Sequence, residues 1–353
     1  MALPNTGQIS LQDMATEFGN SAPHQISEFY GKGNAANSGL IAFSHLYGAS
    51  AQIALTINSN TQELNVQTLA TAAGWSSGAV SITINSGVFI WSDDASVPAI
   101  LVNIPDVTIV NNGNIMGKGG RGGYYDPTNN VTATATAGGP AISITATGCS
   151  ITNSSGAYIG GGGGGGGGVS AGGGAGGGDS GRNYSYSTYG TGGAIGAAGN
   201  QGSGTKPGYG GTAGGGGSGN NTIIAGSNRN GTGGGGGRVF PGTGGAGGNA
   251  SISNTLYPNG YNNFGPGSGY GGSAGSAGQI GGHRPRGDFV NTFNNAVGNR
   301  RGGGGGWGAA GGTDEYISLN WDRVDYPGGS GGGAIINTQS YTLSNSGTIY
   351  GAT

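Results

Sequence analysis

The chain has 353 residues, of which 89 are glycine and only 7% are charged, for a formal net charge of −2. No basic surface is available to neutralise phosphates, which argues against a nucleic-acid-binding protein. A hydrophobic content of 33% is too low for one large conventional core and by itself suggests disorder. The 16 Tyr, 8 Phe and 4 Trp residues and the low net charge favour a folded chain instead.

Residues 1–50 predict a small helical segment. Ser10 and Asp13 form a capping-box-like start, and Gly19 is a plausible stop. Between them runs a short apolar face, made of Ile9, Leu11, Met14, Ala15 and Phe18. Two sequence motifs that resemble each other follow, at residues 26–33 and 41–50. Helices this short do not stand alone in water, so we expect this segment to bind another chain. The Met1–Pro4 start lacks the features of a secretion leader.

The sequence of residues 51–155 predicts a β-rich domain. Val80–Trp91 and Ala99–Ile104 are apolar, β-branched runs, and each predicts a strand. A sequence motif that predicts strand, turn and strand then occurs three times, at residues 108–117, 150–160 and 342–351. Each copy follows an Ala-Ile pair. Repeats of this kind stack because a single unit cannot bury its apolar face alone. We therefore expect residues 334–353 to return to the β-rich base, which makes the intervening glycine-rich region an insertion.

Residues 156–333 predict a bundle of polyglycine-II helices. Uninterrupted runs such as Gly160–Gly168 fit buried rods, since any Cβ would hold neighbouring backbones apart. Glycine at every third position, as in 190–202 and 269–281, fits rods at the edge of the bundle. A flexible linker has no reason for this alternation, and a collagen helix would need far more proline between the glycines.

Aromatic residues are concentrated in the segments between the glycine tracts. Loops on a rigid scaffold are where binding residues gather, and Tyr and Trp among Asn, Ser and Gly is the composition of binding loops. The alternative is that these side chains only cap the open ends of the bundle. The candidate binding residues are Tyr184, Tyr186, Tyr189, Tyr257, Tyr261, Phe264, Phe289, Phe293, Tyr316, Trp321 and Tyr326.

The sequence offers no catalytic or metal-binding set. His24, His45 and His283 are scattered, and no zinc-protease, serine-hydrolase or paired-cysteine spacing is present. Cys149 is the only cysteine and is expected to be a buried, unreactive thiol. We expect no enzyme activity, no cofactor, no metal and no membrane insertion. The acidic residues between 314 and 325 leave a glycosidase open as an alternative.

The chain resembles the distal tail-fibre adhesins of T-even-type bacteriophages that have a polyglycine-II sandwich domain. The resemblance rests on the phrase Val107–Gly120, the run Gly160–Gly168, the alternation of glycine tracts with loops, and the closing Gly347–Gly351. It covers about residues 75–353. It implies a virion protein that binds an outer-membrane protein or surface glycan of the host bacterium through its loops.

Residues 1–50 depart from that family pattern and look like the attachment segments common on phage tail and fibre proteins. The predicted organisation is therefore an attachment segment (1–50), a β-rich domain (51–155), a polyglycine-II sandwich with receptor-binding loops (156–333) and a returning strand unit (334–353). A structural or ice-binding polyglycine-II protein and a polysaccharide-degrading tail spike remain as alternatives.

Overall fold

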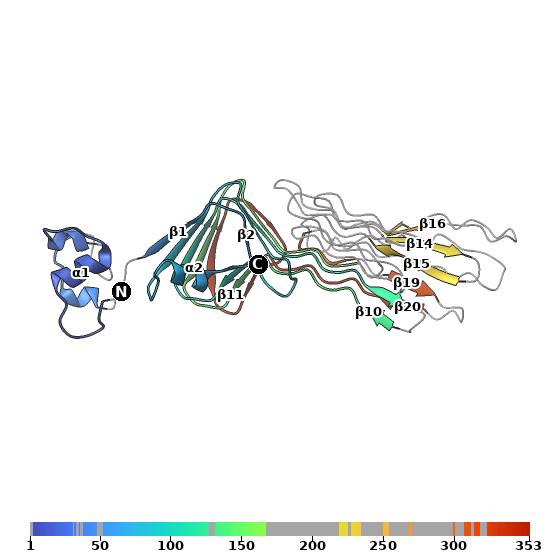
Figure 1. The fold of residues 1–353 in the computed structure, drawn as a ribbon, viewed down its shortest axis with the longest axis horizontal. Coiled ribbons are helices and arrows are strands. Elements are labelled where there is room, and N and C mark those ends of the chain that lie inside the picture. Colours follow the sequence, from blue (N-terminus) through green and yellow to red (C-terminus); the bar gives the residue numbers. More distant parts are fainter. Residues whose placement is uncertain are drawn as a thin grey trace.

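The computed structural model of the chain describes residues 3–30, 32, 35, 38–47, 52–126, 131–166, 219–224, 227–233, 250–253, 268–269, 299–300, 307–311, 314–317 and 323–353. The N-terminal helical turns, the central strands and the strands of the glycine-rich region follow one another along the long axis of the molecule (Figure 1). In the described residues no helix has the length and apolar character needed to cross a membrane.

The N-terminal unit consists of the helix α1 (Leu11–Phe18) and two single 3-10 turns, η1 (Ile26–Phe29) and η2 (Phe43–Leu46). The predicted limits of α1 are confirmed. The Ser10 amide donates to the Asp13 carboxylate at 2.8 Å, the Asp13 amide donates back to Ser10 Oγ at 3.1 Å, and Gly19 ends the helix with a φ of 72°. The unit has a small core of its own, formed by Leu3, Ile9, Met14, Ala15, Phe29, Ala35 and Leu46.

Three parallel sheets form the sides of a triangular solenoid, which Figure 1 shows nearly end-on. Each turn of the chain, or coil, contributes one strand to each side in succession. The first sheet contains β1 (Ile53–Ile57), β4 (Val80–Ile84), β7 (Val107–Asn111), β12 (Cys149–Asn153) and β22 (Tyr341–Asn345). The second contains β2 (Thr61–Gln62), β5 (Phe89–Trp91), β8 (Asn114–Met116), β13 (Tyr158–Gly160) and β23 (Thr348–Tyr350). The third contains β3 (Leu64–Asn65), β6 (Ile100–Val102), β11 (Ile142–Ile144) and β21 (Ile335–Asn337).

The parallel register places like residues above one another inside the triangle. Ile109 pairs with Ile82 on one side and Ile151 on the other, and all three are buried. The second and third sheets repeat the arrangement with Ile115 and Ile142, whose neighbours in register are also isoleucines. These columns meet in a single apolar core. Stacking is what makes each short strand stable, because one coil alone leaves its apolar edge in water.

Three asparagines form a ladder where the first sheet ends: Asn111 and Asn153 are buried, and Asn345 is exposed. Asn111 Nδ2 donates to Asn153 Oδ1 at 2.8 Å, and Asn153 Nδ2 donates to Asn345 Oδ1 at 2.9 Å. Asn111 and Asn345 also accept from the glycine amide two residues further on. The ladder satisfies polar groups at the corner of the triangle and links the last coil to the two before it.

The three strand–turn–strand repeats found in the sequence pair with one another in register, as predicted. The prediction was incomplete at the N-terminal side, where two further coils precede them. The single strand predicted over Val80–Trp91 was wrong: it is split into β4 and β5 by a corner at Asn85–Gly87, where Gly87 has a φ of 78°. A helix that was not predicted, α2 (Val66–Ala72), joins the first coil to the second.

Two insertions leave the solenoid between its second and third sheets. The shorter one lies between β8 and β11 and contains the hairpin β9 (Tyr124–Asp126) and β10 (Val131–Ala133). The longer one lies between β13 and β21. It contains β14 (Gly219–Ile224), β15 (Ser227–Gly233), β16 (Ala250–Ser253), β17 (Ser268–Gly269), β18 (Asn299–Arg300), β19 (Asp314–Ile317) and β20 (Arg323–Tyr326). Strands β10, β14, β15, β16, β19 and β20 lie at the end of the molecule remote from α1 (Figure 1).

Candidate functional site

Five segments, three of them rich in glycine, run side by side away from the solenoid. They are residues 117–123, 134–140, 160–166, 307–311 and 327–333, and we call them the glycine segments. Residues 160–166, the central segment, continue directly from β13. The order of the hydrogen-bond partners shows that 117–123 runs parallel to the central segment, whereas 134–140 and 327–333 run antiparallel to it.

The hydrogen bonds of the central segment repeat every third residue. Residues 160, 163 and 166 accept from the amides of residues 117, 120 and 123, at 2.9, 2.7 and 3.0 Å. Residues 162 and 165 donate to residues 139 and 136, at 2.9 and 3.1 Å, and accept from residues 332 and 329, at 2.7 Å in both cases. Residues 161 and 164 donate to Tyr350 and Ala309, both at 2.9 Å. Each residue of the three-residue period therefore faces a different neighbour.

This packing leaves no room for a side chain. A Cβ on Gly162 or Gly165 would overlap the carbonyl oxygen of Lys118 or Arg121, in the first segment. A Cβ on Gly161 or Gly164 would overlap the backbone of the fifth. The same holds in the neighbouring segments, at Gly117, Gly120, Gly138, Gly311, Gly329 and Gly332. Glycine is required here by the close approach of backbones and not by an unusual φ.

An aromatic cluster anchors the glycine segments to the solenoid. Trp307 is 1% exposed and lies edge-on to Tyr350, with ring centroids 5.0 Å apart. Tyr158 stacks on Tyr350 at 6.5 Å, and Met116 packs in the same cluster. A Cβ at Gly160 would meet the Trp307 ring, so glycine here lets the indole lie against the backbone. Trp307 was not predicted as a site residue, although it follows a run of five glycines.

Two of the predicted receptor-binding aromatics fall on described strands. Tyr316 lies on β19, opposite Val324 of β20, and Tyr326 lies on β20, opposite Asp314. Strand β18 pairs with the other edge of β19, which gives a three-stranded antiparallel sheet. The segment 313–327, predicted as a loop, thus contains a hairpin. The remaining candidates lie outside the described residues: Tyr184, Tyr186, Tyr189, Tyr257, Tyr261, Phe264, Phe289, Phe293 and Trp321.

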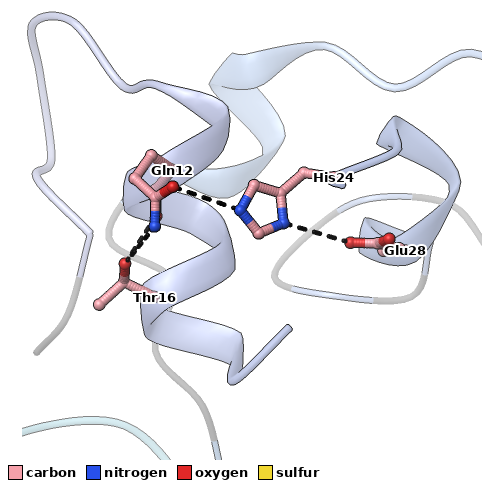
Figure 2. A network of polar contacts seen from close by, with 4 residues as sticks. All are labelled: Gln12, Thr16, His24 and Glu28. Atoms are coloured by element: carbon pink, nitrogen blue, oxygen red, sulfur yellow. Dashed lines mark hydrogen bonds and ion pairs between the residues drawn. The ribbon is translucent and has the colours of Figure 1, made fainter. Parts of the chain in front are cut away.

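A second polar arrangement occurs in the N-terminal unit, at the far end of the molecule. Figure 2 shows the His24 ring between α1 and η1, with Nε2 3.3 Å from Gln12 Oε1 and Nδ1 3.9 Å from Glu28 Oε2. Gln12 also donates to Thr16 Oγ1 at 3.2 Å, one turn along α1. At the start of the same helix, hydrogen bonds from the side chain and the backbone of Ser10 lower the pKa of Asp13. These contacts fix the turns against one another and involve no catalytic constellation.

The described residues offer little other reactive chemistry. Within them, no three His, Cys, Asp or Glu side chains gather as a metal site would require. Burial raises the pKa of the Cys149 thiol to about 11, so the thiol stays protonated near neutral pH. At the corner after β5, hydrogen bonds from the Ser96 backbone and side chain lower the pKa of Asp94.

Comparison with known proteins identifies the family. No curated protein matches the chain. Among solved structures, the crystal structure of the gp37–gp38 adhesin tip complex of the bacteriophage S16 long tail fibre matches with 19% identity and a TM-score of 0.39, over 99% of this chain and 94% of that one. The family described as phage tail fibre adhesin Gp38 matches residues 52–238. Because this match covers more than half of the chain, the protein belongs to the Gp38 phage tail fibre adhesins, the receptor-binding proteins of the virion's tail fibre.

Proposed function

We propose that this adhesin recognises an outer-membrane protein or a surface glycan of the host through the segments that join its glycine segments, and that residues 1–50 attach it to the tail fibre. In this proposal the glycine segments form a bundle of polyglycine-II helices, which carries the recognition segments at the end remote from the attachment unit.

The period-three hydrogen bonding of the central segment is the observation that carries the proposal. Polyglycine-II helices have three residues per turn, so their amides point in three directions and bond to several neighbours. Residues 160–166 show this behaviour toward their described neighbours. A bundle tied together in this way is rigid, and a rigid scaffold can hold variable segments in fixed positions without depending on their sequence.

The composition of the joining segments supports a binding role. They hold the eleven candidate aromatics among Asn, Ser and Gly, a mixture that provides contact area at low cost in side-chain entropy. The strands that are described within the longer insertion lie at the far end of the molecule, where a cell surface is accessible to a fibre-mounted protein (Figure 1).

The attachment role of residues 1–50 is supported by their independence from the rest of the chain. The family match begins at residue 52, and residues 3–47 have a core of their own. The N-terminal unit also lies at the opposite end of the molecule from the strands of the longer insertion, so both ends can be engaged at once (Figure 1). A tail fibre adhesin needs a fibre-binding surface, and in this chain we assign it to the N-terminal unit.

The test is binding of the purified chain to host cells after Tyr184, Tyr261 and Trp321 are changed to Ser. We expect cell binding to be lost while the far-UV circular dichroism spectrum is unchanged. Phe43→Ser, the same type of change at the opposite end, is the matched control and should bind cells normally. Full binding by the triple variant would overturn the assignment of these three residues.

We also propose that the adhesin binds its receptor without cleaving it. Incubation of the purified chain with host envelope should leave the concentration of reducing sugar ends at background. A steady release of reducing ends would instead favour the polysaccharide-degrading alternative and would direct attention to the acidic residues of 314–325.

A further inference from the structure

The last coil of the solenoid has open strand edges. Strands β22 and β23 end the first and second sheets, and each pairs on one side only with a strand of the described residues. On the third side, the Ala352 carbonyl accepts from the Ile335 amide at 3.1 Å, as the Ala334 carbonyl accepts from the Ile142 amide at 3.0 Å one coil earlier. The last coil thus keeps the register of the coils before it and presents a free edge of the same kind.

Apolar side chains of this coil are only partly covered. Leu343 is half-buried, whereas Ile151, its neighbour in register on β12, is 1% exposed. Ile349 is half-buried, whereas Ile159, its neighbour on β13, is fully buried. Both half-buried side chains pack against the solenoid core on one side. A further layer of strands would remove their remaining apolar surface from water, which favours association.

The edge of β22 lacks the usual protection against pairing with another chain. Natural sheets guard a free edge with lysine, proline, a bulge or a covering segment. Residues 335–353 contain no charged residue and no proline, and β22 pairs with β12 over five residues without a bulge. The first coil differs, because Glu63 lies in its corner between β2 and β3. The last coil is therefore the end of the solenoid that can accept a further strand.

The asparagine ladder also stops at this edge. In each rung the amide of one asparagine donates to the side-chain oxygen of the next, from Asn111 to Asn153 and from Asn153 to Asn345. The oxygen of Asn345 accepts from Asn153 and from the Gly347 amide, and the Asn345 side chain is exposed. Its amide group faces the position that a further strand would occupy, and such a strand offers backbone carbonyls as acceptors.

We propose that two copies of the chain pair through β22, edge to edge and antiparallel, so that the first sheets of the two solenoids form one continuous sheet. A twofold axis near Leu343 would place Leu343 opposite its own copy and Thr342 opposite Ser344. An edge without charge does not repel a second copy of itself, and a twofold contact closes at two chains. A strongly charged partner would find no opposite charge here. The pairing does not depend on which segments contact the host.

The experiment is sedimentation velocity of the purified full chain. Wild type should have twice the mass of one chain. Thr342 and Ser344 are exposed, so the double variant Thr342→Lys, Ser344→Lys should fold and sediment as a single chain, because like charges would face each other across the edge. The variant Thr342→Glu, Ser344→Glu should do the same. An equimolar mixture of the two variants should regain the double mass, since each lysine then faces a glutamate.

The matched control lies at the opposite edge of the same sheet. Ala54→Lys with Thr56→Lys adds the same charge at two exposed positions of β1 and should leave the double mass unchanged. A cross-link provides a second measurement. Thr342→Cys with Ser344→Cys should give a disulfide-linked pair of chains on mild oxidation, because opposed residues of antiparallel strands lie close enough for a disulfide. The natural cysteine, Cys149, is buried.

Three results would overturn the proposal. Wild type that sediments as a single chain shows that the edge stays free. Assemblies that grow beyond two chains and are lost in the β1 variant indicate head-to-tail stacking of solenoids instead. A mixture of the lysine and glutamate variants that stays at the mass of one chain shows that β22 does not face its own copy. An unchanged far-UV circular dichroism spectrum of each variant confirms that the substitutions leave the fold intact.

Discussion

Gly162 shows how a single residue maintains the spacing of the glycine segments. Its amide donates to Gly139, its carbonyl accepts from Gly332, and the position of a Cβ is occupied by the carbonyl of Lys118. In Gly162→Ala the neighbouring backbone must move apart, which breaks bonds on at least one side. Overpacking of this kind costs about 1–3 kcal/mol, and more where several backbones share the contact. We expect a lower midpoint of thermal unfolding and faster amide exchange in residues 117–123 and 160–166.

Gly87→Ala provides the comparison at the residue level. Gly87 has a φ of 78° but has open space where a Cβ would be placed, so its substitution costs only the strain of a left-handed backbone, about 1 kcal/mol. The exchange rates of the glycine segments should be unchanged in this variant. Equal effects of the two substitutions on those segments would show that close backbone contact is not what requires glycine at 162.

At the level of the strands, the asparagine ladder joins coils that are far apart in the sequence. Asn153 is fully buried, accepts from Asn111 and donates to Asn345 of the last coil. Asn153→Ala removes both bonds and leaves a buried amide with fewer partners, which costs about 1–3 kcal/mol. Because the bond to Asn345 is the one that reaches β22, we expect increased amide exchange and proteolysis in residues 341–351 first. Thr152→Ala, an exposed change on the same strand, should leave both unchanged.

The strands also show how far the sequence alone can lead. The repeats at residues 108–117, 150–160 and 342–351 are similar enough in sequence to predict that they stack and to indicate the family. Both predictions are confirmed. The first two coils were not predicted, although Val80–Gly87 is another copy of the repeated motif. The alternation of apolar and polar residues conceals the corner at Asn85–Gly87, so β4 and β5 look like one strand in the sequence. The two related segments at 26–33 and 41–50 were recognised in the sequence, and in the structure each contains one of the two 3-10 turns, η1 and η2. Trp307 could not be predicted, since its partners Tyr158 and Tyr350 lie far away in sequence.

For the whole molecule, the register of the coils implies that the long insertion can be removed. In the second coil, residues 92–99 connect β5 to β6; in the fourth, residues 161–334 connect β13 to β21. Trp91 pairs in register with Met116, which pairs in turn with Gly160, and Ile100 pairs with Ile142, which pairs with Ile335. The two connections therefore begin and end at equivalent positions of the solenoid. A chain in which 92–99 replaces 161–334 should therefore fold as a solenoid with the N-terminal unit attached. It should bind the tail fibre with unchanged affinity and fail to bind host cells.

Three measurements on this shortened chain test the division of roles between the two ends. Far-UV circular dichroism reports whether the solenoid forms without the glycine segments, while fibre binding and host-cell binding report on the two ends separately. Failure to fold would mean that the Trp307 cluster is needed to stabilise the second sheet, and restoring residues 307–311 in the shorter connection should then rescue folding. If the shortened chain folds and still binds host cells, the receptor-binding surface lies on the solenoid or on the β9–β10 hairpin. A chain that folds but no longer binds the fibre would show that attachment needs the insertion as well as residues 1–50.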